Sequence, residues 1–306
     1  MTRQRPIKHW LLLFVIVVLW GSAFGLTEIA ITSFTPMALV TGRLILAAIV
    51  LTLIVWLRGQ RLPRSARFWL FSLALAIAGN CLPFWLITRA QLTIDSGLAG
   101  ILMSVMPLST LLLAHLFVAG EQLNRYKLAG CFIGLAGLIV LIGPEALLEL
   151  NGQGTVLLAE LATLFAAFCY AANAIIARHR PTFDPITAAA GTMIVGAALM
   201  VPLGAAALPL QITNASGQAL AAAIALAMMA SALAPVVFYQ LITLAGPSFV
   251  AFLNYLIPVW AVVIGVVLFG EQPRWTSLLA LVIILIGLAT SERDWRRSTV
   301  IDSQSS

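Results

Sequence analysis

Four prolines lie in the middle of long apolar stretches, where the loss of a backbone N–H group has chemical consequences. In a helix, each proline removes a hydrogen-bond donor and clashes with the carbonyl group four residues earlier. Inside a membrane, a carbonyl freed in this way needs a partner from protein or cavity water. We expect the four to act as hinges around a central site, with static kinks as the alternative; they are Pro83, Pro107, Pro235 and Pro258.

Aromatic and polar residues gather near these prolines and in the first and sixth apolar stretches. Rings accompanied by a few amide or hydroxyl groups are typical of pockets for small amphipathic solutes. The rings would hold an apolar side chain, while amides and freed carbonyls would hold the polar end. The predicted cavity residues, of which about half could instead fill the helix bundle, are Trp20, Asn80, Phe84, Trp85, Met103, Met106, Tyr170, Asn173, Ser231, Tyr239, Asn254 and Tyr255.

One arginine falls inside an apolar stretch. Arg43 lies about 10 Å from the boundary of its stretch if the segment is helical, and an unpaired guanidinium at such a depth costs several kcal/mol. Glu28 lies at a similar depth in the preceding stretch, so we predict an ion pair between Glu28 and Arg43. The alternative is that Arg43 contacts a bound solute directly.

The chain lacks the residue groups that an enzyme would need. His9, His115 and His179 are far apart in the sequence, and the three cysteines are scattered. No Gly-x-x-x-x-Gly-Lys loop for nucleotide binding occurs. We predict that the protein is not an enzyme and has no catalytic residue, metal or cofactor.

The composition indicates an integral membrane protein. Hydrophobic residues make up 61% of the 306 residues and charged residues 9%, with a mean hydropathy of +1.04, whereas soluble domains contain about 25% charged residues. Helices of about 20 apolar residues cross the membrane. We predict an all-α membrane protein with ten transmembrane helices at 10–31, 36–57, 68–88, 96–118, 128–143, 155–177, 186–206, 219–243, 247–268 and 276–291.

The second half of the chain repeats the first. Met106-Pro107 and Gly120-Glu121-Gln122 are answered by Ile257-Pro258 and Gly270-Glu271-Gln272. Because each copy holds an odd number of spans, the second copy is inverted, and such repeats place a binding site between them at the bilayer midplane. We predict two inverted five-helix repeats at 1–144 and 155–291, an outer linker at 145–154 and a cytoplasmic tail at 292–306.

Two further motifs have structural interpretations. Glycine at the end of one span would end its helix, and Glu121 or Glu271 would then lie beside the positive end of the helix that follows. Gly130 and Gly134 form a small-xxx-small pair, which serves either dimerisation or tight packing within the bundle. A homodimer and a monomer both remain open.

The net charge of +6 arises from loops and not from one basic face, so we predict no nucleic-acid partner. With a cytoplasmic N-terminus, fourteen of the 17 Lys and Arg residues fall in cytoplasmic segments, in agreement with the positive-inside rule. We therefore predict a multi-pass protein of the bacterial inner (plasma) membrane. Both termini would face the cytoplasm, and the lipid bilayer and a small-molecule substrate would be its partners.

The sequence resembles the drug/metabolite transporter superfamily, EamA type, and within it the bacterial amino-acid and metabolite exporters. The matching features are Trp20-Gly21-Ser22, Gly42-Arg43-Leu44 and the mid-span proline followed by Gly-Glu-Gln in each half. The resemblance covers nearly the whole chain and implies ten helices around a central cavity lined by spans 1, 3, 4, 6, 8 and 9. Cys169-Tyr170 departs from the usual pattern, which leaves the cavity chemistry of the second half open.

The function implied is a secondary transporter that exports amino acids, including aromatic and bulky apolar ones, and related metabolites by alternating access. A multidrug or nucleobase exporter of the same fold is the alternative. Glu28 and Glu160 fall in the outer third of their spans, and the other acidic residues fall in loops or the tail. Because no carboxylate is expected at the midplane, we expect transport that is not obligatorily coupled to protons. The alternative is proton movement through Glu160 or His115.

Overall fold

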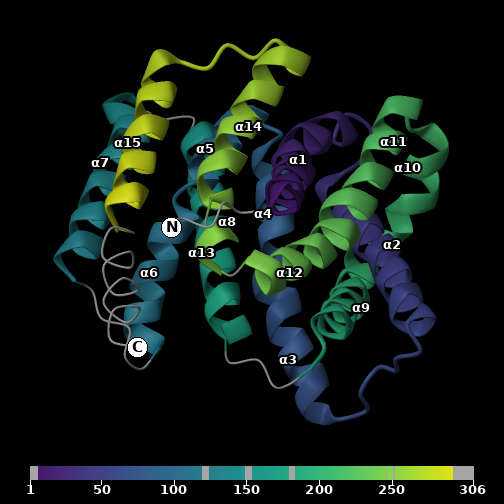
Figure 1. Ribbon diagram of the computed structural model, residues 1–306. Helices are drawn as coiled ribbons and strands as arrows, with labels where there is room; N and C mark the ends of the chain where they lie inside the picture. Colours follow the sequence, from purple (N-terminus) through teal and green to yellow (C-terminus); the bar gives the residue numbers. More distant parts are fainter. Residues whose placement is uncertain are drawn as a thin grey trace, which may run out of the picture.

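The computed structural model describes residues 6–118, 124–148, 154–178, 183–245, 247–250 and 252–291. Within these ranges the chain is helical, without strands (Figure 1). When the shorter helices that belong to one span are counted together, the helices form ten consecutive segments. Each of the ten predicted spans falls within one of these segments, apart from single residues at some ends. The predicted all-α membrane fold is confirmed.

The helices have the following bounds. The first half contains α1 (Ile7–Ala30), α2 (Pro36–Leu57), α3 (Ala66–Ala76), the π-helical turn η1 (Ile77–Cys81), α4 (Leu82–Ala90), α5 (Ser96–Met103), α6 (Met106–Phe117) and α7 (Arg125–Leu148). The second half contains α8 (Thr155–Arg178), α9 (Pro185–Gly204), η3 (Ala205–Ala207), α10 (Leu208–Asn214), α11 (Gly217–Ala225), the π-helical turn η4 (Leu226–Leu233), α12 (Ala234–Ala245), α13 (Pro247–Val250), α14 (Leu253–Phe269) and α15 (Trp275–Ser291).

Most of these segments are long and apolar enough to cross a bilayer. Among the described residues, seven stretches of at least 18 residues qualify, and two shorter apolar helices, Leu253–Phe269 and Trp275–Ser291, accompany them. Large apolar side chains such as Trp56 and Val267, each 71% exposed, lie on the outside of the bundle. A surface of this kind is stable in contact with lipid and not with water.

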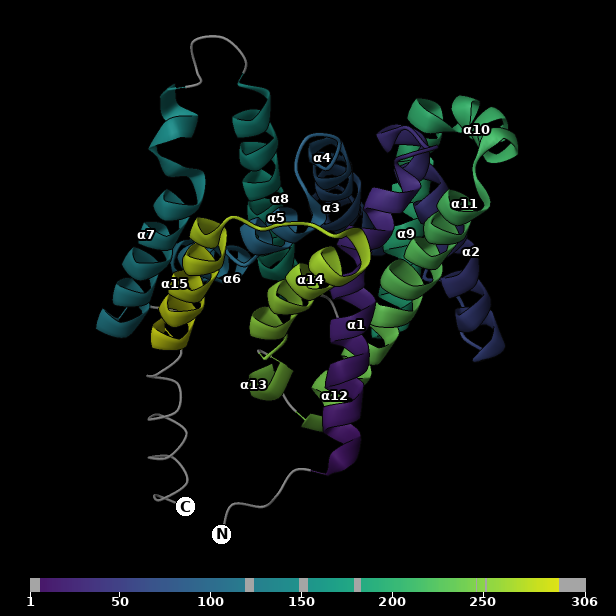
Figure 2. The ribbon, with the colours of Figure 1, turned by 90° about the horizontal axis from the view of Figure 1, so that it is seen from above.

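The two halves interlock through helix pairs at opposite edges of the bundle. In both views α2 packs beside α9 and α7 packs beside α15 (Figure 1, Figure 2). Each pair combines one helix from each half, and buried side chains such as Leu44, Leu51 and Met193 fill the first pair. Helices α1, α4, α5, α8 and α14 lie between the two pairs.

Glycines permit the close approach of α7 and α15. A methyl group at Gly287 of α15 would lie 2.7 Å from both the carbonyl oxygen of Gly130 and the amide nitrogen of Gly134. Any side chain there would push the helices apart, because a side-chain carbon does not approach a backbone oxygen or nitrogen so closely. Tight packing within the bundle, one of the two predicted roles of Gly130 and Gly134, is therefore present, and dimerisation stays a prediction.

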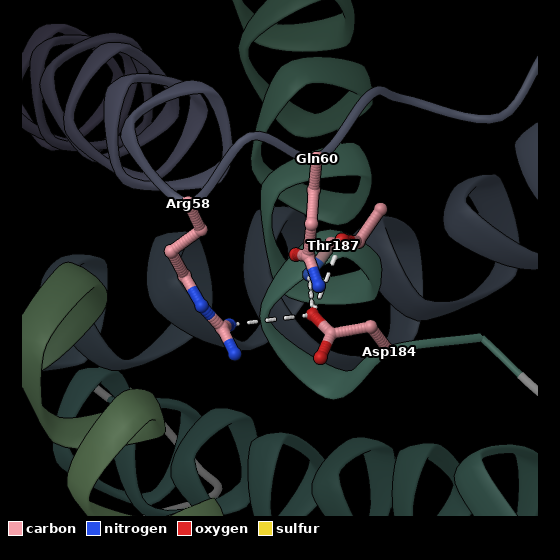
Figure 3. A network of polar contacts seen from close by, with 4 residues as sticks. All are labelled: Arg58, Gln60, Asp184 and Thr187. Atoms are coloured by element: carbon pink, nitrogen blue, oxygen red, sulfur yellow. Dashed lines mark hydrogen bonds and ion pairs between the residues drawn. The ribbon is translucent and has the colours of Figure 1, made fainter.

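Polar contacts hold α2 and α9 together at both ends of the pair. Asp184 caps α9 by accepting a hydrogen bond from the Thr187 amide at 2.9 Å, and its Oδ2 lies 3.6 Å from Nη1 of Arg58 at the end of α2 (Figure 3). At the other end, the amide of Thr35, just before α2, donates to Oε1 of Gln211 at 3.0 Å. The start of α9 is thus bonded to the residue that follows α2, and the start of α2 is bonded to α10, which follows α9.

The environment of Asp184 favours its ionised form. Partial burial alone would raise the pKa of the Asp184 carboxyl, but hydrogen bonds from the backbone and side chain of Thr187 and the charge of Arg58 outweigh it. The pKa therefore lies below its ordinary value, and the carboxylate stays charged at the start of α9, where the helix dipole also favours a negative charge.

Candidate functional site

A π-helical turn precedes a proline at matching places in the two halves. η1 ends at Cys81, two residues before Pro83, and η4 ends at Leu233, two residues before Pro235. A π turn contains an extra residue and is frequent at functional sites. Here it leads the helix toward a residue that has no N–H group to donate.

The other two prolines differ from each other. Pro107 is the second residue of α6 and follows a break in the helix at Ser104–Val105. Pro258 lies inside the continuous helix α14, and the helix of that span is interrupted earlier, between α13 and α14. Three of the four predicted hinge prolines therefore lie at an irregular backbone, and Pro258 does not. Whether any of them moves stays a prediction.

Trp20 of α1 contacts the π turn of the opposite half. Its indole N–H donates a hydrogen bond of 3.1 Å to the carbonyl oxygen of Ala230. In a π turn this carbonyl would accept from the N–H five residues later, which is the position of Pro235. Trp20 therefore satisfies the carbonyl that Pro235 leaves without a donor, and its ring lies 5.2 Å from that of Phe238.

Four of the residues singled out in the sequence meet between the two halves. We call this group the Arg43 cluster; it comprises Arg43 (α2), Phe84 (α4), Tyr170 (α8) and Ser231 (η4). Nε of Arg43 donates to Oγ of Ser231 at 2.5 Å, and the guanidinium carbon lies 3.8 Å from the centroid of the Phe84 ring. The ring of Tyr170 lies 6.5 Å from that of Phe84, centroid to centroid.

The predicted ion pair between Glu28 and Arg43 is wrong. No carboxylate oxygen of a described residue lies within 4.0 Å of the Arg43 nitrogens. The two residues have a similar depth, but their side chains leave neighbouring helices in different directions. Arg43 extends toward α4 and η4, whereas Glu28 extends toward the start of α5.

Two carboxylates meet at the N-terminal end of α5. Glu271 accepts hydrogen bonds from the amides of Ser96 at 3.0 Å and Gly97 at 2.9 Å, and from the Ser96 hydroxyl. Oε2 of Glu28 lies 3.2 Å from the same Ser96 nitrogen. One carboxylate from each half thus binds the positive end of one helix. Burial, followed by the charge of Glu271, raises the pKa of the neighbouring Asp95.

The prediction that Glu271 lies beside the helix that follows it is wrong, because its carboxylate caps α5 and not α15. Gly270 adopts a left-handed conformation, with φ of 65°, that ends α14 and turns the chain back. The Glu271 side chain then passes over Gly97 and Gly265, where a methyl group would collide with its carboxylate. Glycine at both positions is the feature of the sequence that fits this contact, because only a residue without a side chain leaves room for the carboxylate. The matching Glu121 lies outside the described residues.

The other predicted cavity residues are distributed over several helices. Asn173 packs against Gly79 in η1, next to the buried Asn80, whose amide donates to the Leu75 carbonyl at 3.3 Å. Over the described residues, no hydrogen bond or ring contact joins the following four to the Arg43 cluster: Trp85, Met103, Met106 and Asn254. Tyr255 is partly buried in α14, and the side chain of Tyr239 lies outside the described residues.

One hollow on the molecule lies away from these residues. An apolar surface groove of about 560 Å³ runs along α2 and is lined by Ala48, Ile49, Thr52, Leu53, Trp56 and Ile194. It contains none of the predicted cavity residues, and its side chains are those that a lipid chain would contact. The central cavity therefore stays a prediction.

Comparison with known proteins shows which family the chain matches. Residues 8–143 and 157–291 each match the EamA-like transporter family. The chain is 28% identical over 283 residues to the uncharacterized inner membrane transporter YedA of Escherichia coli K12, covering 90% of this chain and 88% of that protein. It is 24% identical over 283 residues to an uncharacterized transporter of Archaeoglobus fulgidus, covering 92% and 96%.

A solved structure described only as "Crystal structure of protein" shares the fold. It superposes with a TM-score of 0.64 at 21% identity, over 96% of this chain and 99% of that one. The family matches together span most of the chain, one in each half, and both relatives are named as transporters. This multi-pass membrane protein therefore belongs to the EamA-like transporter family.

Proposed function

We propose that this transporter exports amino acids, including aromatic and other bulky apolar ones, across the bacterial inner membrane. The observation that supports this best is the Arg43 cluster, to which each half contributes two side chains within membrane-spanning helices. Its rings suit an apolar side chain and its polar groups suit a charged end. A site shared by two repeats is typical of transporters in which the repeats move against each other.

Alternating access would use the irregular points of the helices. η1, η4 and the break before α6 lie in three of the central spans, and a helix bends more readily at such points than in a regular stretch. The closely packed pairs α2–α9 and α7–α15 would move less. Because no described carboxylate belongs to the Arg43 cluster, we expect efflux down the gradient of the amino acid, without obligatory proton exchange.

Resistance of whole cells to toxic substrates tests the proposal. Cells that overproduce the protein are expected to tolerate toxic aromatic amino-acid analogues at several-fold higher concentrations than cells with an empty vector, because the analogue is expelled. Growth across a concentration series is the measurement. Unchanged sensitivity to the analogues, together with protection against cationic dyes, would contradict amino-acid export and favour a multidrug exporter.

A further inference from the structure

We propose that the Arg43 guanidinium binds the carboxylate of the substrate, so that transported solutes share a carboxylate or an anion of similar shape. The inference rests on the proposed function for the location of the site, and it adds the chemical group that the site requires. Three observations carry it: the hydrogen bonds that Arg43 does not make, the way its plane is held, and the rings beside it.

The guanidinium has donors to spare. It has five N–H groups, and the only hydrogen bond that it makes with the described residues is the one from Nε to Ser231. No carboxylate among those residues lies within ion-pairing distance. An arginine inside a membrane normally pairs with an acidic residue or a carbonyl, since its charge is otherwise costly. A charge without such a partner is explained if an anion arrives as the substrate.

The neighbours of Arg43 fix the orientation of its plane. Phe84 covers one face of the guanidinium at 3.8 Å, and Ser231, which is only 1% exposed, holds the Nε edge. This leaves the end formed by Nη1 and Nη2 available. Two parallel N–H groups at that end match the two oxygens of a carboxylate, a geometry that lysine cannot supply.

The rings beside the guanidinium suit the rest of an amino acid. Phe84 and Tyr170 lie 6.5 Å apart at an angle of 57°, so an apolar side chain could contact both while the carboxylate binds Arg43. A cationic solute without a carboxylate would meet the like charge of Arg43 and leave its donors unpaired. The cluster therefore selects amphipathic acids and zwitterions over lipophilic cations.

Competition between closely related compounds tests the requirement for a carboxylate. In proteoliposomes, uptake of labelled phenylalanine by counterflow is measured with unlabelled phenylalanine, 3-phenylpropionate, phenylalaninamide or phenethylamine as competitor. Phenylalanine and 3-phenylpropionate are expected to compete, whereas the amide and the amine should need about 10- to 100-fold higher concentrations, since hydrogen bonds to a charged partner are lost. Equal competition by phenylalaninamide would overturn the inference.

Variants of Arg43 link the preference to this residue. Arg43→Gln should reduce phenylalanine uptake at least about tenfold and remove the difference between acid and amide, while Arg43→Lys should keep a weaker preference for the acid. Arg89→Gln, which changes an exposed arginine at the end of α4, should leave the competition order unchanged. A full preference for the acid in Arg43→Gln protein of normal membrane content would place the anion elsewhere.

A binding measurement separates failure of this inference from failure of the proposed function. If phenylalanine is not transported at all, 3-phenylpropionate should still raise the melting temperature of the purified wild-type protein and not that of Arg43→Gln. That result would discard amino-acid export and retain the anion site. No stabilisation of the wild type, or equal stabilisation of both proteins, would discard the anion site.

Discussion

Replacing Glu271 with alanine is expected to release the N-terminal end of α5 from the second half of the protein. The carboxylate accepts hydrogen bonds from the Ser96 and Gly97 amides and from the Ser96 hydroxyl. One bond to a charged acceptor contributes about 1.5–3 kcal/mol, so the loss of even one of them should make opening at this end at least about 10- to 100-fold more frequent. Glu28 is a weaker substitute, because it reaches one of these amides at 3.2 Å.

Hydrogen exchange measures this opening directly. Amides in the first turn of α5 should exchange faster in Glu271→Ala than in the wild type, with little change in α9, which is capped by its own Asp184. Gln272→Ala, at the exposed neighbouring residue, serves as the matched control and should leave exchange unchanged. The contact would be unimportant if Glu271→Ala and Gln272→Ala gave the same exchange at Ser96 and Gly97.

Replacing Trp20 with phenylalanine should destabilise the protein and slow transport, although the ring is largely kept. The change removes the N–H group that binds the Ala230 carbonyl. That carbonyl lies in a π turn before Pro235 and would be left without a donor inside the membrane, at a cost of about 1–3 kcal/mol. The π turn of η4 also carries Ser231, so the loss should weaken the support of Arg43.

A second tryptophan offers the control for this prediction. Trp260 donates from its indole to the Ser22 hydroxyl at 2.9 Å. When the indole is removed, that hydroxyl keeps its own O–H group to donate, whereas a carbonyl can only accept. Trp260→Phe should therefore lower the melting temperature of the purified protein less than Trp20→Phe. Equal losses in the two variants would show that the bond to Ala230 has no special role.

The spans and their order could be predicted from the sequence because hydropathy and the internal repeat depend only on residue type and position along the chain. The same holds for the irregular helices: Pro83 and Pro235 signal that a regular bond is missing. They do not tell whether a π turn or a break results, and at Pro258 the helix simply continues. The difference depends on which donors, such as the indole of Trp20, approach from other helices.

The contacts across the bundle could not be predicted in the same way. Depth along a helix placed Glu28 and Arg43 at one level, but it does not give the direction in which a side chain leaves its helix. Glu271 was placed by its neighbours in sequence, whereas its partners at Ser96 and Gly97 are neighbours only in space. Of the twelve predicted cavity residues, Phe84, Tyr170 and Ser231 join Arg43 in one cluster.

Counterflow of labelled phenylalanine in proteoliposomes that contain only this protein tests the central claim most directly. Vesicles loaded with unlabelled phenylalanine should accumulate the label transiently without an imposed pH difference, and Arg43→Gln should reduce that accumulation to near the level of empty vesicles. Two results would contradict amino-acid transport through the Arg43 cluster. One is that the wild type accumulates no label, and the other is that the wild type and Arg43→Gln accumulate it equally.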